Sequence, residues 1–287
     1  MQNSATVRTE HPDCASDLLR DLSIEITAKD HHKIGLLRGR IPQATPISIT
    51  FLPGEDFESR VLAACRVREA GFTPVPHISA RRLHLEAELD SFLAALTAQA
   101  SVDRVFVVGG DIAEPAGSFD DALAVIRSGA LARHGIAQVG IAGYPEGHPD
   151  IPGAVLERAL FDKLEALDAA GQQSWIATQF SFDADPVLDW LAALRTRTAV
   201  PVRVGVAGPA SIKALLRFAA RCGVGVSAKV MAKYGLSLTQ LLGSAGPGPL
   251  IHELGHRLRS DIHGDVRLHF YPFGGLEKTA DWIAAFR

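Results

Sequence analysis

Eight short runs rich in β-branched residues recur along the chain and limit its fold more than any other feature. They span residues 23–28, 46–51, 73–79, 104–110, 138–143, 174–180, 202–208 and 266–273. Most of the intervals between them carry an apolar pattern of helical period, at 57–70, 83–98, 119–133, 154–170, 186–195 and 211–222. Apolar strands that alternate with helices are typical of a parallel sheet covered on both faces.

The number of these units favours closure of the sheet. Eight units at roughly 30-residue spacing predict a single α/β domain of the (β/α)8 TIM barrel class, and a doubly wound open sheet is the alternative. The interval 223–265 holds two helical patterns split by a loop at 243–249, which indicates an elaborated seventh unit. We expect residues 1–20 to form an N-terminal extension and residues 21–287 the barrel.

The composition of the chain indicates which classes of partner and which compartment to expect. The formal net charge is −3 and no long basic block occurs, so we expect neither nucleic acid nor a membrane as partner but a small molecule. Cys14, Cys65 and Cys222 are far apart and form no CxxC pair, which argues against a disulfide framework and fits a cytoplasmic protein. The chain has no basic start followed by an apolar core and no run of 18 apolar residues, so we expect it to be soluble and unprocessed. The sequence allows the protein to form a homo-oligomer.

Polar side chains gather where the apolar runs end. In a barrel these ends meet at one mouth, where catalytic groups lie. The segment Ile141–Pro149 places Tyr144 and His148 just past the fifth run. The other candidates at run ends are Thr50, His77, Ser79, Gly110, Asp111 and Gln179.

Glu25 differs because it lies inside the first run. An inward carboxylate is desolvated, which moves carboxyl pKa values toward the range of a general acid. The alternative is that Glu25 faces a polar layer of the barrel or pairs with a cation.

Three of the run-end residues each allow a functional and a structural interpretation. Asp111 follows two glycines that would let a flat ligand approach the backbone, but Gly-Gly-Asp is also an ordinary turn. The Gln179 amide could recognise the edge of a heterocycle such as a pterin, or it could cap a chain end. His77 could bond a phosphate or a flavin edge, or it could be a structural histidine.

The segment His252-Glu253-Leu254-Gly255-His256 matches the zinc-protease pattern HExxH. A zinc protease also needs a third ligand and an edge strand for its substrate, and no Met-turn signature follows here. We therefore interpret the segment as a surface helix and expect no metal site. No Gly-x-Gly-x-x-Gly follows the first run and no P-loop occurs, so a nucleotide cofactor must be held in another way.

Three motifs together resemble the methylenetetrahydrofolate reductase family: Val108-Gly109-Gly110-Asp111, Ala142-Gly143-Tyr144-Pro145-Glu146-Gly147-His148-Pro149 and Thr178-Gln179-Phe180-Ser181-Phe182-Asp183. The resemblance extends over residues 23–273. It implies a (β/α)8 barrel that binds FAD, a flavin that gives hydride to 5,10-methylenetetrahydrofolate to form 5-methyltetrahydrofolate, and NADH or NADPH as reductant. It also implies a place in one-carbon metabolism and methionine biosynthesis. A folate-binding accessory barrel without flavin is the alternative.

The resemblance assigns roles to single residues. Glu25 is implied to be the general acid that opens the methylene bridge. Asp111 would lie near flavin and pterin as a second catalytic and substrate-binding group, and Gln179 would bond the pterin. The implied flavin contacts are Thr50, His77, Gly110, Asp111, Ala142, Tyr144 and His148, with Lys163 as the nearby basic candidate.

The chain departs from the family pattern in three places. Ile24-Glu25-Ile26-Thr27-Ala28-Lys29 replaces the usual Phe-Glu-Phe-Phe-Pro-Pro, and Gly274-Gly275 stands where the family has Asn-Arg. Gly109 occupies the position of the arginine in the family's Arg-Gly-Asp. The last change removes a cation from the expected contact with the flavin diphosphate.

Overall fold

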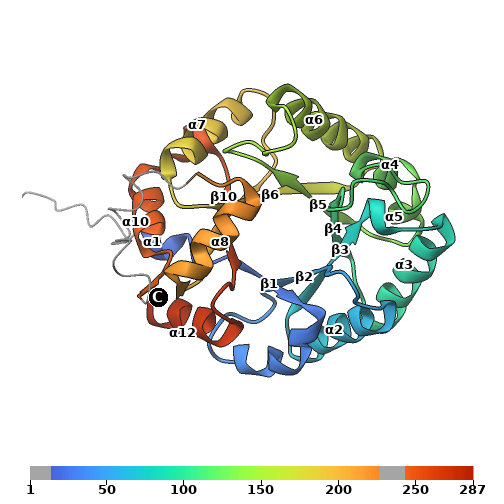
Figure 1. Ribbon diagram of the computed structural model, residues 1–287, viewed down its shortest axis with the longest axis horizontal. Helices are drawn as coiled ribbons and strands as arrows, with labels where there is room; N and C mark the ends of the chain where they lie inside the picture. The colour runs from blue at the N-terminus through green and yellow to red at the C-terminus, as the bar shows by residue number, and fades with distance from the viewer. Residues whose placement is uncertain (1–13, 226–242, 287) are drawn as a thin grey trace, which may run out of the picture.

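The computed structural model describes residues 14–225 and 243–286. Eight parallel strands close into a barrel in the order β1-β10-β7-β6-β5-β4-β3-β2, with helices around it (Figure 1). The strands are β1 (Ser23–Thr27), β2 (Pro46–Thr50), β3 (Thr73–Ser79), β4 (Arg104–Val108), β5 (Gln138–Gly143), β6 (Gln173–Ser181), β7 (Val202–Ala207) and β10 (Val266–Tyr271). Each coincides with a predicted run to within two residues at either end. The predicted (β/α)8 barrel is confirmed, and the open sheet is wrong.

The remaining elements follow the strands in the order expected for a barrel. They are α1 (Cys14–Asp17), η1 (Ala28–Leu37), α2 (Phe57–Glu69), η2 (Ala80–Arg82), α3 (Glu86–Ala100), α4 (Ala122–Arg127), α5 (Ala130–Arg133), α6 (Gly153–Ala169), α7 (Ala184–Arg195), α8 (Ile212–Cys222), α10 (Gly248–Arg257), α11 (Ser260–His263) and α12 (Leu276–Phe286). A two-stranded antiparallel pair, β8 (Ala210–Ser211) and β9 (Ser244–Ala245), stands apart from the barrel.

One predicted helical segment differs from the structure, and another lies outside the described residues. The segment 119–133 forms two short helices, α4 and α5, because Gly129 between them adopts a left-handed conformation with a φ of 73°, which ends α4. The first helical pattern of the seventh unit falls in 226–242, outside the described residues. The loop at 243–249 contains β9 and leads into α10.

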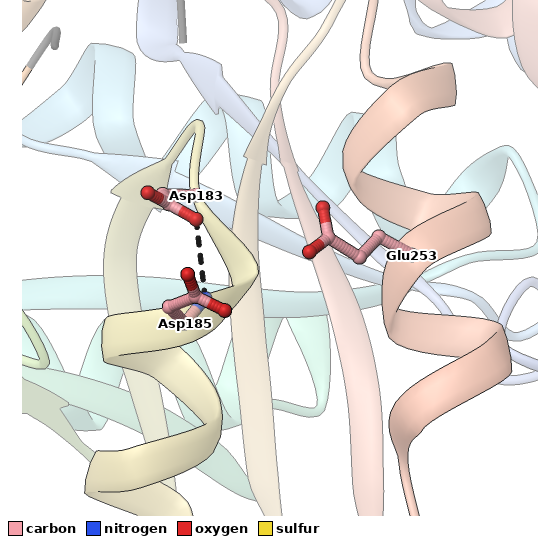
Figure 2. A group of neighbouring side chains, drawn as sticks. All are labelled: Asp183, Asp185 and Glu253. Carbon is pink, nitrogen blue, oxygen red and sulfur yellow. Dashed lines mark hydrogen bonds between the residues drawn. The ribbon is translucent and has the colours of Figure 1, made fainter. Parts of the chain in front are cut away.

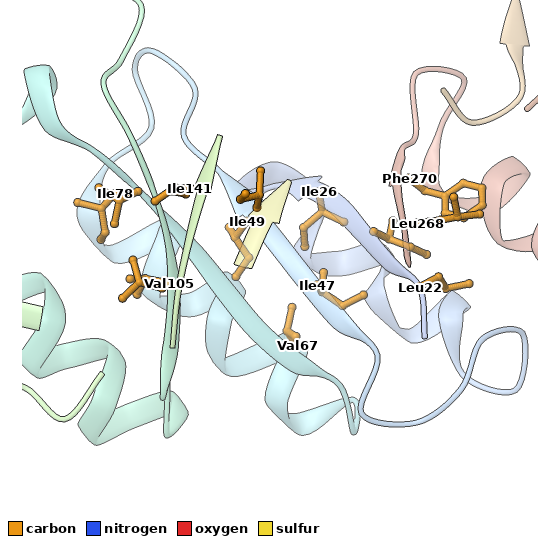
Figure 3. Close-up of a cluster of buried hydrophobic side chains, with 14 of the residues drawn as sticks. Leu22, Ile26, Ile47, Ile49, Val67, Ile78, Val105, Ile141, Leu268 and Phe270 are labelled. Atoms are coloured by element: carbon orange, nitrogen blue, oxygen red, sulfur yellow. The ribbon is translucent and has the colours of Figure 1, made fainter. Parts of the chain in front are cut away.

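The hydrophobic core lies between the strands and the ring of helices. Alternate strand residues such as Ile26, Ile49 and Ile78 point outward and are at most 2% exposed. Figure 3 shows them with Val67 of α2 and with Leu268 and Phe270 of β10. Burial of one such side chain stabilises the fold by about 1.5–3 kcal/mol, so the β-branched runs themselves supply the packing that closes the barrel.

The inside of the barrel is partly polar, because charged and polar side chains share it with an apolar cluster of Val75, Phe106 and Ala177. It contains a cavity of about 230 Å³. Glu25, His77 and His269 line its middle. Toward the amino ends of the strands the lining includes Arg104, Gln138, Gln173, Arg203 and Arg267.

Two further predictions concern the N-terminal extension and membrane-spanning helices. Helix α1 packs against α10, and Ala15 within it is buried with the core. The division into a 1–20 extension and a 21–287 barrel stays a prediction. Among the residues that the structure describes, no helix combines the length and the apolar character needed to span a bilayer.

Candidate active site at the carboxyl end of the barrel

Glu25 lies inside the barrel between two histidines. Its Oε2 is 3.7 Å from His77 Nε2 and 3.9 Å from His269 Nε2, and its side chain is 20% exposed. Ser23 Oγ lies 2.8 Å from His269 Nδ1 and fixes that ring. Successive strand residues alternate between faces, so Ser23 and Glu25 both point inward from β1. The arrangement holds one carboxyl group beside two imidazoles in a largely closed space.

His77 is held as a neutral imidazole. Burial lowers its pKa to about 4, and this effect outweighs the opposing charge of Glu25. The ring packs against Phe106 with centroids 4.9 Å apart. Arg60 donates to the main-chain oxygen of His77. The same guanidinium lies over the ring of Phe51, 4.6 Å from its centroid, and so joins the ends of β2 and β3.

Gln179 stands on a bulge at the end of β6. The register of β6 against β7 shifts between Ala177 and Phe180. Gly205 permits the shift, because a Cβ there would lie 2.5 Å from the main-chain oxygen of Gln179. The Tyr271 hydroxyl donates to the main-chain oxygen of Thr178 at 2.8 Å. Burial and the nearby Glu25 charge raise the pKa of Tyr271 well above its ordinary value, so this phenol is a neutral donor to the bulge.

The loop after β5 is tied to two other parts of the chain. The rings of Tyr144 and His148 meet edge to face with centroids 5.5 Å apart. Glu146 accepts from Ser181 Oγ at 2.6 Å and from the N–H of Gly225 at 2.9 Å. Burial raises the pKa of Tyr144. These bonds fix the loop between β6 and the chain that follows α8.

Helix α8 lies over the barrel opening, inside the ring formed by the other helices (Figure 1). Its Phe218 stacks on Phe273 with centroids 4.0 Å apart, and Phe273 meets Phe180 of β6 at 4.9 Å. Leu215 and Ala219 of the helix are buried in the same cluster. The carboxyl end of the barrel therefore has an aromatic cover on the side of β6, β7 and β10.

Asp111 lies apart from Glu25, on the exposed side of the carboxyl end. Its side chain is 65% exposed and pairs with Arg82 of η2, whose Nη2 is 2.6 Å from Asp111 Oδ1. Gly110 has a φ of 107°, and a Cβ on it would lie 2.7 Å from Ser79 Oγ. The turn after β4 therefore needs glycine to pass so close to the end of β3, whatever its function.

The remaining candidates lie on β2, β5 and α6. Thr50 is the last residue of β2 and is half-buried. Ala142 packs with Val75, Phe106 and Ala177. Lys163 of α6 has a pKa lowered by burial, with the Asp121 carboxylate opposing that shift. The structure thus brings Glu25 and His77 together, and Tyr144 and His148 together, and it sets Lys163 toward Asp121 at the start of α4.

The HExxH segment lies on α10 and serves packing. The His252 ring is 4.9 Å from that of Phe286. Glu253 lies with Asp183 and Asp185 in a group whose carboxylate oxygens are within 4.8 Å of one another (Figure 2). Among the described residues this is the one group of three that could share a metal, and it contains no histidine. Arg257 bonds Asp185 at 2.6 Å and Glu253 at 2.7 Å, so a guanidinium already compensates these charges.

Sequence reasoning missed His269, Tyr271 and Arg82. The first two could have been found, because residues 267, 269 and 271 alternate along the eighth run and share one face. Arg82 gave no signal, since its partner Asp111 stands 29 residues further along the chain.

Fold and site together define a (β/α)8 barrel with a partly buried carboxyl group beneath a mouth of aromatic and polar side chains. Residues 39–238, more than half of the chain, match the methylenetetrahydrofolate reductase family. The chain belongs to that family.

One solved structure of low sequence identity shares the fold. A protein from Clostridium thermocellum, described as uncharacterized and as binding two copies of 5-methyl-5,6,7,8-tetrahydrofolic acid, matches with a TM-score of 0.60 and 12% identity. The match covers 93% of this chain and 96% of that one. A thermostable aldo-keto reductase matches with a TM-score of 0.49 and 13% identity over 100% of this chain and 95% of its own, a likeness too weak to support an inference.

Proposed function

We propose that the protein is a cytoplasmic flavoenzyme that interconverts 5,10-methylenetetrahydrofolate and 5-methyltetrahydrofolate, with FAD as cofactor and NADH or NADPH as electron partner. The observation that carries the proposal is the Glu25 carboxyl group, enclosed between His77 and His269 in a chain of this family. The Clostridium thermocellum protein of the same fold supports a folate ligand.

The carboxyl end has a donor set that suits a flavin. Gly109 has open space where a side chain would stand, so a ring or a phosphate can approach the backbone there. Tyr144 and His148 offer hydrogen bonds from the loop after β5, and Thr50 offers a hydroxyl from the end of β2. These residues would hold the cofactor over the strand ends.

Reduction of the methylene bridge requires one hydride and one proton. FAD, when bound, supplies the hydride chemistry. Glu25 would donate the proton to the bridge nitrogen and so open the ring to an iminium electrophile. In the oxidative direction the same carboxylate would take the proton back. Neutral His77 adds no positive charge beside the Glu25 carboxyl group.

The remaining residues would orient the folate. Gln179, on the bulge of β6, would offer a donor and an acceptor to the pterin edge. Tyr271 fixes that bulge through Thr178. Asp111 would approach the pterin from the end of β4. Positioning of this kind matters because a reacting group displaced by about 1 Å costs about 100-fold in rate.

The test is the substitution Glu25→Gln, which keeps the shape and removes the acid. Folate turnover should fall by about 100- to 10,000-fold, the usual contribution of a general acid. Reduction of the bound flavin by dithionite should be unchanged, and Glu58→Gln on the exposed face of α2 serves as control. Unchanged folate turnover in the Glu25 variant would reject the assignment.

A second candidate is a folate-binding accessory barrel without flavin. Gly109, which removes a cation from the carboxyl end, favours it. The absorption spectrum of the purified protein with added FAD separates the two. An oxidised-flavin band that 5-methyltetrahydrofolate bleaches without oxygen supports the enzyme, whereas folate binding without any flavin supports the accessory barrel.

A further inference from the structure

The two arginines of η2 have different partners. Arg81 donates Nε to the main-chain oxygen of Asp120 at 2.7 Å and Nη1 to that of Ile112 at 3.2 Å. Its guanidinium thereby holds the loop between β4 and α4. Arg82 directs Nε and Nη2 to one oxygen of Asp111, at 2.9 and 2.6 Å. The second guanidinium is therefore held by a side chain that can move, and the first by the backbone.

Arg82 lies among strand ends that the proposed flavin site uses. Its guanidinium is 5.2 Å from the centroid of the Phe51 ring, which directly follows Thr50. Its other neighbour, Asp111, follows β4. The main chain of η2 bonds this segment as well, because the N–H of Arg81 donates to the Gly109 oxygen at 2.8 Å. The cation thus stands between the ends of β2 and β4.

Arg82 and Asp111 differ in the exposure of their side chains, and the difference indicates that Arg82 can exchange its partner. The Arg82 side chain is 19% exposed, whereas that of Asp111 is 65% exposed. A solvent-exposed carboxylate gains about 0–1 kcal/mol from such a pair. A phosphate group accepts two parallel hydrogen bonds from a guanidinium and carries more charge, so it would displace the carboxylate.

We propose that Arg82 binds the diphosphate of the flavin, and that flavin binding releases Asp111 from Arg82 toward the folate. The inference rests on the proposed function, because FAD is the ligand. It gives the carboxyl end a cation that residue 109, a glycine here, does not supply. Lys163 is a weaker candidate for that role, since it lies half-buried on α6, where burial lowers its pKa.

The experiment compares FAD, FMN and riboflavin, which share the ring and differ in phosphate. Dissociation constants are measured by quenching of flavin fluorescence in the wild type, Arg82→Gln, Arg82→Lys, Asp111→Asn and the control Arg66→Gln, an exposed arginine paired with Glu69 on α2. Arg82→Gln should weaken FAD and FMN by about ten-fold or more and leave riboflavin unchanged. Arg82→Lys should restore part of the loss, and Asp111→Asn should bind FAD at least as tightly as the wild type.

Each other outcome has a distinct meaning. Equal FAD affinity in the wild type and Arg82→Gln overturns the inference and leaves the proposed function standing. An equal loss for riboflavin also overturns it, because the residue would then act on the ring or on folding. A wild-type protein that binds no flavin rejects the proposed function together with the inference.

Discussion

The two ends of the barrel use the same ion pair, arginine with aspartate, for different purposes. At the amino end Arg203 bonds both the main-chain oxygen and the carboxylate of Asp21, and Arg267 bonds Asp21 and Asp265. At the carboxyl end Arg82 bonds one exposed carboxylate. The amino-end guanidiniums join β7 and β10 to the chain that precedes β1, whereas Arg82 joins two turns next to the proposed site.

The difference shows how one barrel separates stability from function. A charge held by several partners changes partner only at a cost in stability, because each partner left unpaired adds a desolvation cost. A charge held by one exposed partner can exchange it for a ligand. The amino end is therefore a structural network, and the carboxyl end keeps a cation available.

The largest expected effect on stability comes from His77, in the interior between the two ends of the barrel. His77 has a pKa of about 4 in the folded protein and an ordinary value near 6.5 when unfolded. Since the folded pKa is the lower one, the unfolded state takes up the proton first as the pH falls. Stability should therefore decrease between about pH 6.5 and pH 4, by on the order of 3 kcal/mol from this group, and then level off.

Denaturant unfolding of the apo protein at several pH values measures this loss. His77→Gln should show a flatter pH dependence than the wild type across that window. If the two stability curves run parallel, His77 does not hold its neutral form against solvent, and the interior would be more open than the structure shows.

The next largest effect on the free energy of unfolding tests the arginine–aspartate network at the amino end. Arg203→Gln should lower the free energy of unfolding by about 2 kcal/mol, because it breaks charged hydrogen bonds of a largely buried guanidinium. Flavin affinity should not fall with it, since the residue lies at the other end of the barrel. Thermal unfolding and flavin titration of the same preparation give both values. A loss of flavin binding with unchanged stability would reverse the contrast between the two ends.

Much of the fold could be predicted because it depends on local pattern. The β-branched runs form strands, as in β3 and β5, since alternate residues fill the space under the helices. The break between α4 and α5 lies at Gly129, whose φ of 73° ends the helix, and it interrupts an apolar pattern that otherwise continues. A single glycine leaves the apolar periodicity around it unchanged, so the periodicity alone does not reveal the break.

The site was predictable only in part, for a geometric reason. The rule that functional groups lie where strands end picks Tyr144, His148 and Gln179 as candidates. It does not say that Glu25 has two imidazoles beside it, because the positions of β3 and β10 around the barrel bring them there. The bulge that directs Gln179 depends on Gly205 in another strand, and no reading of β6 alone reveals it.

The smallest expected effect on stability is that of Arg82, compared with that of Arg203. Arg82→Gln should change the stability of the flavin-free protein by less than about 1 kcal/mol, because its partner is exposed and the pair is screened by solvent. Arg203→Gln removes the same functional group but should lower the free energy of unfolding by more. The ratio of the two losses therefore measures how much each end of the barrel contributes to the stability of the fold. Urea unfolding of both variants beside Arg66→Gln gives that ratio. Equal losses for Arg82 and Arg203 would mean that the carboxyl-end pair is also structural, and a guanidinium needed for folding would not be free to change its partner for a phosphate.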